Sequence, residues 1–303
     1  NLLSRILQRL RWFFASGTRL IALLLLVVGL PGVIPGQLGS VFPSGLVRFH
    51  TAISAELVGM ALAVLLIDTA NELRSEREQK EALILQMGSP DNGFAVEAVR
   101  QLRARDWLTD GSLQEAWLRS ANLQGAALEH ANLQRTLLSC ANLQGAKLWS
   151  ANLQGAKLWS TNLRGAHLER ANLQGAALPQ ANLQGASLIE VDLQGANLGS
   201  VNLQGANLWG ANLQGAVLME ADLQETHLGS TNLQGANLWG TNLQGAANAK
   251  IEQIRQPASL EGATLPDGTK LPDNDSWHEV FEAWCETVQL DDYGYIVPAP
   301  PED

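Results

Sequence analysis

The stretch ANLQGAKLWSANLQGAKLWS, residues 141–160, contains the same ten residues twice. It belongs to a longer pattern in which leucine occupies every fifth position from Leu113 to Leu243, which makes 27 leucines without an exception. Two residues before each leucine stands Ala, Thr, Val or, once, Gly111. Self-similarity at a fixed short period indicates a repeat architecture.

A period of five does not suit a helix. At about 100° per residue, successive leucines would step around the helix and cover every face. In an extended chain, residues two apart point to the same side. The small residue and the leucine of each pentad therefore point inward together, and the chain then turns. We expect stacked turns around one narrow core, which includes Leu123, Leu143, Leu153, Leu173, Leu183, Leu203, Leu213 and Leu233.

The repeated units resemble those of the pentapeptide-repeat family. ANLQG occurs six times, with variants such as VDLQG and ADLQE, and the resemblance covers residues 111–245. It implies a mainly β fold, a right-handed quadrilateral β-helix with four pentads, or 20 residues, in each coil. In this family a small residue and a Leu or Phe point inward from each pentad. Here the central position is always Leu.

The pentads alternate between a nearly constant unit and a variable one. With four pentads per coil, the variable units line two opposite faces, and steps of 20 residues gather their outward residues into two columns. Aromatic residues at a surface are the usual anchors of interfaces. The candidate partner-binding residues are Trp149, Trp159, Ile189, Trp209, Met219 and Trp239. The alternative is an ordinary surface, since single exposed apolar residues are common.

The N-terminal region predicts an α-helical transmembrane hairpin before the repeats. Between Arg19 and Arg48 lie 28 residues without a charge, enough to cross a bilayer. A second apolar run follows at 52–67. Basic residues flank the outer ends of both runs, which places both termini and the repeats in the cytoplasm at the inner membrane. Residues expected to pack the two helices are Ala55, Glu56, Gly59 and Ala63. Glu56 could instead stay hydrated near the headgroups.

These patterns divide the chain into six segments. They are an interfacial amphipathic helix (1–17), the transmembrane helical hairpin with a cytoplasmic extension (18–86), an N-terminal capping helix (87–110), the repeats (111–250), a C-terminal cap with an acidic helix (251–290) and a disordered tail (291–303). Ser89 is the predicted N-cap of the N-terminal capping helix, with Pro90 in its first turn. Asp275 is the predicted N-cap of the last helix. The apolar face of the last helix packs on the final coil or receives a partner; it carries Trp277, Val280, Phe281 and Trp284.

Charge and motifs narrow the possible functions. The acidic balance lies in residues 251–303, with 2 basic and 12 acidic side chains, and no basic footprint for nucleic acid is present. No catalytic or metal-binding motif appears, so we expect no enzymatic activity, cofactor or metal. An enzyme would be indicated only by a cofactor bound to the purified protein.

The sequence therefore predicts a membrane-anchored scaffold that presents a rigid repeat domain to another protein, as an accessory subunit of a membrane complex. Its partners would be membrane lipid and an unidentified protein. The first alternative is a homo-oligomer assembled through the transmembrane hairpin. The family resemblance also implies a DNA-mimicking topoisomerase inhibitor. The near-neutral charge of residues 111–250, with 7 basic and 8 acidic side chains, argues against that role.

Overall fold

The computed structural model describes residues 44–298, and the side chains from residue 56 onward. The helices in this range are α3 (Ser44–Met87), α4 (Asn92–Ala104), α5 (Ile251–Ile254) and α6 (Trp277–Thr287). The chain forms two compact units, residues 1–79 and 80–303. The predicted interfacial helix and residues 20–43 of the first apolar run lie outside the described residues.

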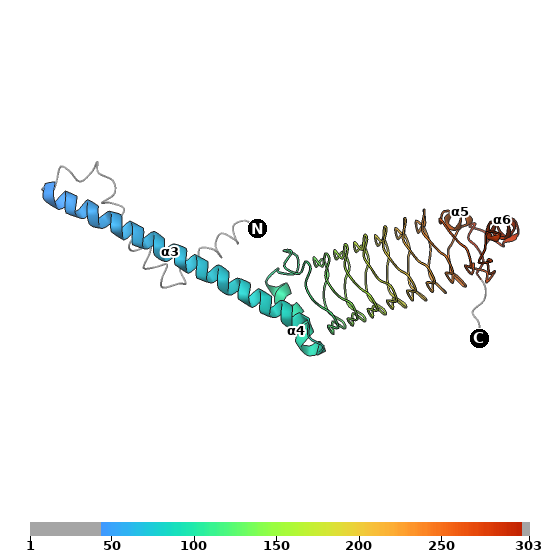
Figure 1. The fold of residues 1–303 in the computed structure, drawn as a ribbon, viewed down its shortest axis with the longest axis horizontal. Coiled ribbons are helices and arrows are strands. Elements are labelled where there is room, and N and C mark those ends of the chain that lie inside the picture. The colour runs from blue at the N-terminus through green and yellow to red at the C-terminus, as the bar shows by residue number, and fades with distance from the viewer. Residues whose placement is uncertain (1–43, 299–303) are drawn as a thin grey trace. The chain divides into compact units, whose positions relative to one another are not determined.

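The repeats form a solenoid between α4 and α5, with 20 residues in each coil (Figure 1). From Trp117 to Ala247, single parallel bridges join residues at the second position of a pentad to their equivalents 20 positions later, as in Asn122 with Asn142 and Asn142 with Asn162. A turn follows every leucine. In one such turn the Ala126 N–H donates to the Leu123 carbonyl at 3.0 Å.

The prediction of a mainly β fold is wrong. Residues 44–298 contain isolated bridges but no continuous strand. The physical reason is the length of the pentad, because each unit spends two of its five residues in a turn. The last residue of the turn has a positive φ, 67° at Gly125 and 58° at His130, which takes the backbone out of the extended region. The chain turns before a second consecutive residue can pair.

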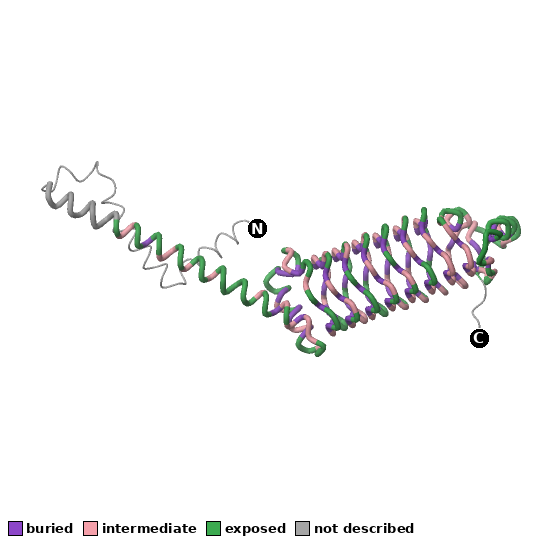
Figure 2. The backbone as a smooth tube through the Cα atoms, in the orientation of Figure 1, coloured by how far each residue is buried: buried purple, intermediate pink, exposed green. Residues whose placement is uncertain are grey.

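Leucine fills the axis of the solenoid. All 27 leucines of the five-residue period are at most 1% exposed, and the buried colour recurs along every coil (Figure 2). The predicted core residues Leu123, Leu143, Leu153, Leu173, Leu183, Leu203, Leu213 and Leu233 belong to this set. Threonine is tolerated at buried small-residue positions because its hydroxyl finds an acceptor. Thr161 Oγ1, for example, donates to the Leu138 carbonyl at 2.9 Å.

Amide side chains on the constant faces tie neighbouring coils together. Asn142 Nδ2 donates to Asn122 Oδ1 at 3.1 Å, and Asn162 Nδ2 donates to Asn142 Oδ1 at 3.0 Å. Glutamines do the same, as where Gln134 Nε2 donates to Gln154 Oε1 at 3.1 Å. These side-chain ladders run parallel to the backbone bridges and hold each coil in register with the next.

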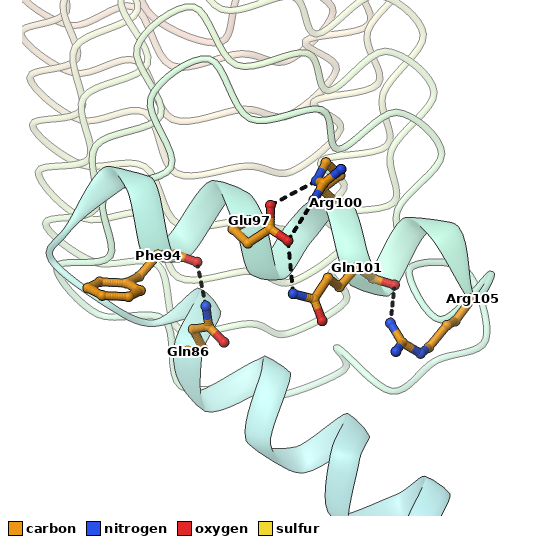
Figure 3. Close-up of polar contacts among 6 residues, drawn as sticks. All are labelled: Gln86, Phe94, Glu97, Arg100, Gln101 and Arg105. Carbon is orange, nitrogen blue, oxygen red and sulfur yellow. Dashed lines mark hydrogen bonds and ion pairs between the residues drawn. The ribbon is translucent and has the colours of Figure 1, made fainter.

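Helix α4 caps the N-terminal end of the solenoid and packs its buried face of Ala95, Ala98, Val99 and Leu102 against the core. Its N-cap is Asp91, not the predicted Ser89, because Asp91 Oδ1 accepts the Phe94 N–H at 3.1 Å. On its exposed side, hydrogen bonds from Arg100 and Gln101 lower the pKa of Glu97 to about 2 (Figure 3).

Backbone and side-chain bonds also close the edge of the first coil. The Asn122 N–H donates to the Ser89 carbonyl at 2.9 Å, and the Asn132 N–H donates to the Leu108 carbonyl at 2.8 Å. Asn92 Nδ2 adds a bond to the Gln124 carbonyl at 3.1 Å. An unpaired edge would otherwise offer a template for aggregation.

Residues 251–298 cap the other end of the solenoid. Trp277, Phe281 and Trp284 of α6 are buried, whereas Val280, which the sequence placed on the same face, is 38% exposed. The helix begins after Ser276, and no side chain caps it, so the predicted cap at Asp275 is wrong. Ile296, within the predicted disordered tail, is buried, and its N–H donates to the Ala249 carbonyl at 2.9 Å.

The predicted transmembrane hairpin is wrong over the described part of the chain, in which no helix is both long and apolar enough to cross a membrane. The apolar run at 52–67 is shorter than the roughly 20 residues that a span needs, and α3 continues from it into a segment rich in charge. Glu56, Gly59 and Ala63 are exposed, and apart from its chain neighbours and the nearby backbone of its own helix, no described atom lies within 4 Å of a Cβ built on Gly59. The side chain of Ala55 lies outside the described residues.

Candidate functional site: a groove on one variable face

The variable pentads present two columns of outward side chains on opposite faces. Within a column, the residue that follows one member bonds through its N–H to the carbonyl of the next member, as where the Ser150 N–H donates to the Glu169 carbonyl at 2.8 Å and the Arg170 N–H donates to the Ile189 carbonyl at 2.9 Å. The first column is Glu129, Trp149, Glu169, Ile189, Trp209 and Gly229. The second is Arg119, Ser139, Trp159, Pro179, Gly199, Met219 and Trp239.

The structure divides the predicted partner-binding residues between these faces. Trp149, Ile189 and Trp209 lie in the first column, and Trp159, Met219 and Trp239 lie in the second. The exposed fractions are 41% for Trp149, 55% for Trp159, 45% for Trp209 and 39% for Met219. Ile189 and Trp239 are half-buried. Four of the six predicted residues are therefore exposed, and the other two are partly accessible to solvent.

One face is hollowed into a shallow, open groove. Its volume is about 830 Å³, within the range of known ligand sites. Trp149 and Ile189 supply its apolar lining, and charged or titratable side chains from neighbouring coils surround them, among them Lys147, His167 and Glu169. The first column thus carries a concave surface as well as exposed apolar residues.

Fixed contacts hold the side chains around this groove. The His130 ring stands edge-on to the Trp149 ring, with centroids 4.2 Å apart and planes at 79°. Arg170 Nε donates to Glu190 Oε2 at 2.7 Å, which pairs those two charges. Arg103 of the N-terminal cap pairs with Glu129. The indole of Trp149 and the rim of the groove are therefore held before any partner arrives.

Glu169 lines the groove as a carboxylate. Burial alone would raise its pKa, but hydrogen bonds from the Ser187 hydroxyl, from its own backbone and from His167 outweigh that effect and hold the pKa below its ordinary value. Among the described residues its one ion-pair partner is His167, whose Nδ1 lies 3.4 Å from Glu169 Oε1. A histidine neutralises a carboxylate only when it is protonated. The Glu169 side chain is 31% exposed and can be reached from solvent.

Sequence analysis missed Trp117, which is 80% exposed and the most exposed tryptophan of the described chain. It stands at the second position of its pentad, where the structure pairs it with Leu137 of the next coil. That position also points outward, so a search of second-position columns would have found it. The same search would have placed Lys147 and His167 next to each other.

Replacing Gly229 with alanine is expected to displace the Trp209 ring. A Cβ at residue 229 would overlap the six-membered part of that indole, so either the ring or the backbone must shift. We expect a loss of about 1–3 kcal/mol in the free energy of unfolding, the usual cost of overpacking. Urea unfolding measures it. In a Trp209→Ala background the same substitution should cost little, and an equal cost in both backgrounds would show that the ring is not the obstacle.

A 20-residue register, an unbroken leucine core and exposed variable faces define a solenoid repeat protein. The profile of the family described as pentapeptide repeats matches in eight copies, over residues 112–149, 150–185, 166–205, 196–235 and 221–247. The chain belongs to the pentapeptide repeat family.

Several solved structures resemble this chain. They include a pentapeptide repeat protein, Rfr23, from the cyanobacterium Cyanothece 51142, at 42% identity over 28% of this chain and 58% of that one, with a TM-score of 0.28. HetL from Nostoc sp. strain PCC 7120, a protein involved in heterocyst differentiation regulation, is 31% identical over 52% of this chain and 90% of its own, with a TM-score of 0.26. A pentapeptide repeat protein of the Arabidopsis thaliana thylakoid lumen is 25% identical over 42% of this chain and 83% of its own, with a TM-score of 0.26. None of the curated proteins matches.

Proposed function

We propose that this protein is a non-enzymatic scaffold whose variable faces bind another protein. The observation that carries the proposal is the exposure of Trp149, Trp159 and Trp209, between 41% and 55%, on coils held in register by bridges and amide ladders. Large aromatic side chains on a rigid support lose little conformational freedom on binding and are frequent interface anchors. Membership of a repeat family agrees with a role in protein–protein interaction.

The test compares the two faces in the full-length chain. One double variant, Trp149→Ala with Trp209→Ala, removes the indoles of the first column. The other, Trp159→Ala with Trp239→Ala, removes those of the second. Each tagged protein is purified from its native cells, and the proteins that accompany it are quantified by mass spectrometry. Circular dichroism confirms that all variants keep the fold.

We expect one defined protein to accompany the wild type and one double variant, and to be lost from the other. That result would assign the binding face. If wild type and both variants retain the same proteins in the same amounts, the tryptophans do not anchor a partner and the proposal is wrong.

Self-association is the second candidate, favoured by exposed apolar side chains on α3, namely Met60, Leu62, Leu66, Ile67 and Leu73. Gly59→Leu is expected to change the mass measured by light scattering if copies meet along this part of α3. Attachment to the inner membrane, contact with its lipid and cytoplasmic termini stay predictions. Cell fractionation with protease protection tests them.

A further inference from the structure

The groove beside Trp149 carries different side chains from the surface around Trp159, although the two tryptophans stand in identical pentads. The two pentads of the opening decapeptides, residues 146–150 and 156–160, both read AKLWS. Trp149 and Trp159 therefore have the same sequence neighbours and comparable exposure, 41% and 55%. Their neighbours along the solenoid differ. Trp149 adjoins Glu169 in its column, whereas Trp159 adjoins Ser139 and Pro179.

Only the first of these two tryptophans borders the groove of about 830 Å³ that Glu169 and Ile189 also line. Members of a column in adjacent coils lie roughly 4.8 Å apart, so the indole and the carboxylate can contact one planar group together. Arg103 and Arg170 already pair with Glu129 and Glu190, the other carboxylates of the groove. Besides its hydrogen bonds from the Ser187 hydroxyl and its own backbone, Glu169 forms an ion pair only with His167 among the described residues, so no lysine or arginine of this range pairs with its carboxylate.

We propose that this groove binds an arginine side chain of the protein partner, stacked on Trp149 and hydrogen-bonded to Glu169. The inference rests on the proposed scaffold function and names the chemistry of its partner. A guanidinium is planar, stays charged, stacks on aromatic faces and can donate two hydrogen bonds to a carboxylate. Attraction between a cation and an indole adds to the pairing.

The apolar lining extends the site along the solenoid. Ile189 follows Glu169 in the same column and is half-buried, so it contributes a flat apolar patch one coil beyond the carboxylate. Lys147, two residues before Trp149 in the same pentad, is exposed and also lines the groove, and its charge disfavours a second cation in the partner segment. The partner segment that fits this order carries an aliphatic residue close to its arginine.

The test selects peptides from a random library displayed on phage, using the immobilised full-length chain. Selected peptides are then synthesised and titrated against the wild type and four variants: Trp149→Ala and Glu169→Gln in the groove, Trp159→Ala on the other face, and Tyr293→Ala as a control outside both faces. Each peptide is also made with citrulline in place of arginine, which keeps the shape and removes the charge. Thermal unfolding confirms that each variant is folded.

We expect the selected peptides to share an arginine near an aliphatic residue. Trp149→Ala and Glu169→Gln should each weaken binding about tenfold or more, as should citrulline, because each removes a charge-assisted bond or the stacking surface. Tyr293→Ala, the control at an aromatic residue that is 80% exposed and lies outside both columns, should leave the dissociation constant within about twofold.

Two results would overturn the inference, and they differ in what they say of the scaffold. Peptides whose binding fails on Trp159→Ala but survives Trp149→Ala would leave the scaffold function standing and move its interface to the other face. Peptides that bind all variants equally would overturn the arginine site and the use of the tryptophan columns together.

Discussion

Leu173→Ala is expected to lower the free energy of unfolding by roughly 2–5 kcal/mol. Leu173 is fully buried on the axis, and its N–H donates to the Asp192 carbonyl of the next coil at 2.7 Å. The cost should lie in the upper part of that range. Bridges and amide ladders hold the coils at a fixed spacing, so the wall cannot collapse into the cavity that the missing side chain leaves.

Urea unfolding followed by circular dichroism measures the effect. Trp159→Ala serves as the control, since an exposed surface substitution usually changes stability by no more than about 0.5 kcal/mol. Leucines elsewhere on the axis, such as Leu143 and Leu213, are equally buried and should give similar costs. A loss below about 1 kcal/mol at Leu173 would mean that the axis is less tightly packed than the burial of its leucines indicates.

Trp284→Ala should cost about 3–5 kcal/mol. Trp284 is 5% exposed, stacks on Phe281 with ring centroids 5.7 Å apart, and donates from Nε1 to Asp267 Oδ2 at 2.7 Å. It therefore joins α6 to the segment around Asp267, which extends the solenoid beyond Leu243, the last leucine of the five-residue period. Loss of this contact removes packing and leaves the Asp267 carboxylate without its indole donor.

Thermal unfolding and size-exclusion chromatography check this prediction. Trp284→Phe keeps an aromatic ring and loses the hydrogen bond, so it should cost about 1 kcal/mol, well below the alanine variant. The alanine variant should also aggregate before the wild type does, since an uncapped solenoid exposes core and backbone. If both variants unfold like the wild type, α6 does not stabilise the end of the solenoid.

The core was predictable because a period of five residues leaves few arrangements that put every leucine inside. The absence of continuous strands was not predictable in the same way. The inward pattern of Ala121 and Leu123 is the same whether a segment pairs over one residue or several. Only the positions of the turns, with positive φ at the fifth residue of each pentad, decide that each coil pairs through single bridges.

The ends of the solenoid show the limits of local signals. Ser89 followed by Pro90 is a common start of a helix, but Asp91 has the carboxylate that meets the Phe94 N–H. For the apolar run at 52–67, composition suggested a span, but α3 runs through it and into charged residues without a break. Apolar character alone could not fix where the helix begins and ends.

The groove was half predictable. Steps of 20 residues bring Trp149, Glu169 and Ile189 into one column, and the sequence analysis named the first and last as partner-binding candidates. It did not join them to His130, whose ring meets Trp149 from the end of another pentad. His130 is the fifth residue of its pentad and Trp149 the fourth, so the two belong to different columns. A column lists only residues at one pentad position, so it does not show contacts between positions.

The coil length has a consequence for how such a gene can change. Inserting or deleting a block of twenty codons adds or removes a whole coil and returns every later residue to its original side. A block of ten codons, like the decapeptide repeated at 141–160, moves every later residue half a coil around and exchanges the two variable sides. Tandem duplication in this gene therefore always lengthens the solenoid, and an odd number of inserted decapeptides also exchanges its two variable faces, whereas an even number leaves them in place.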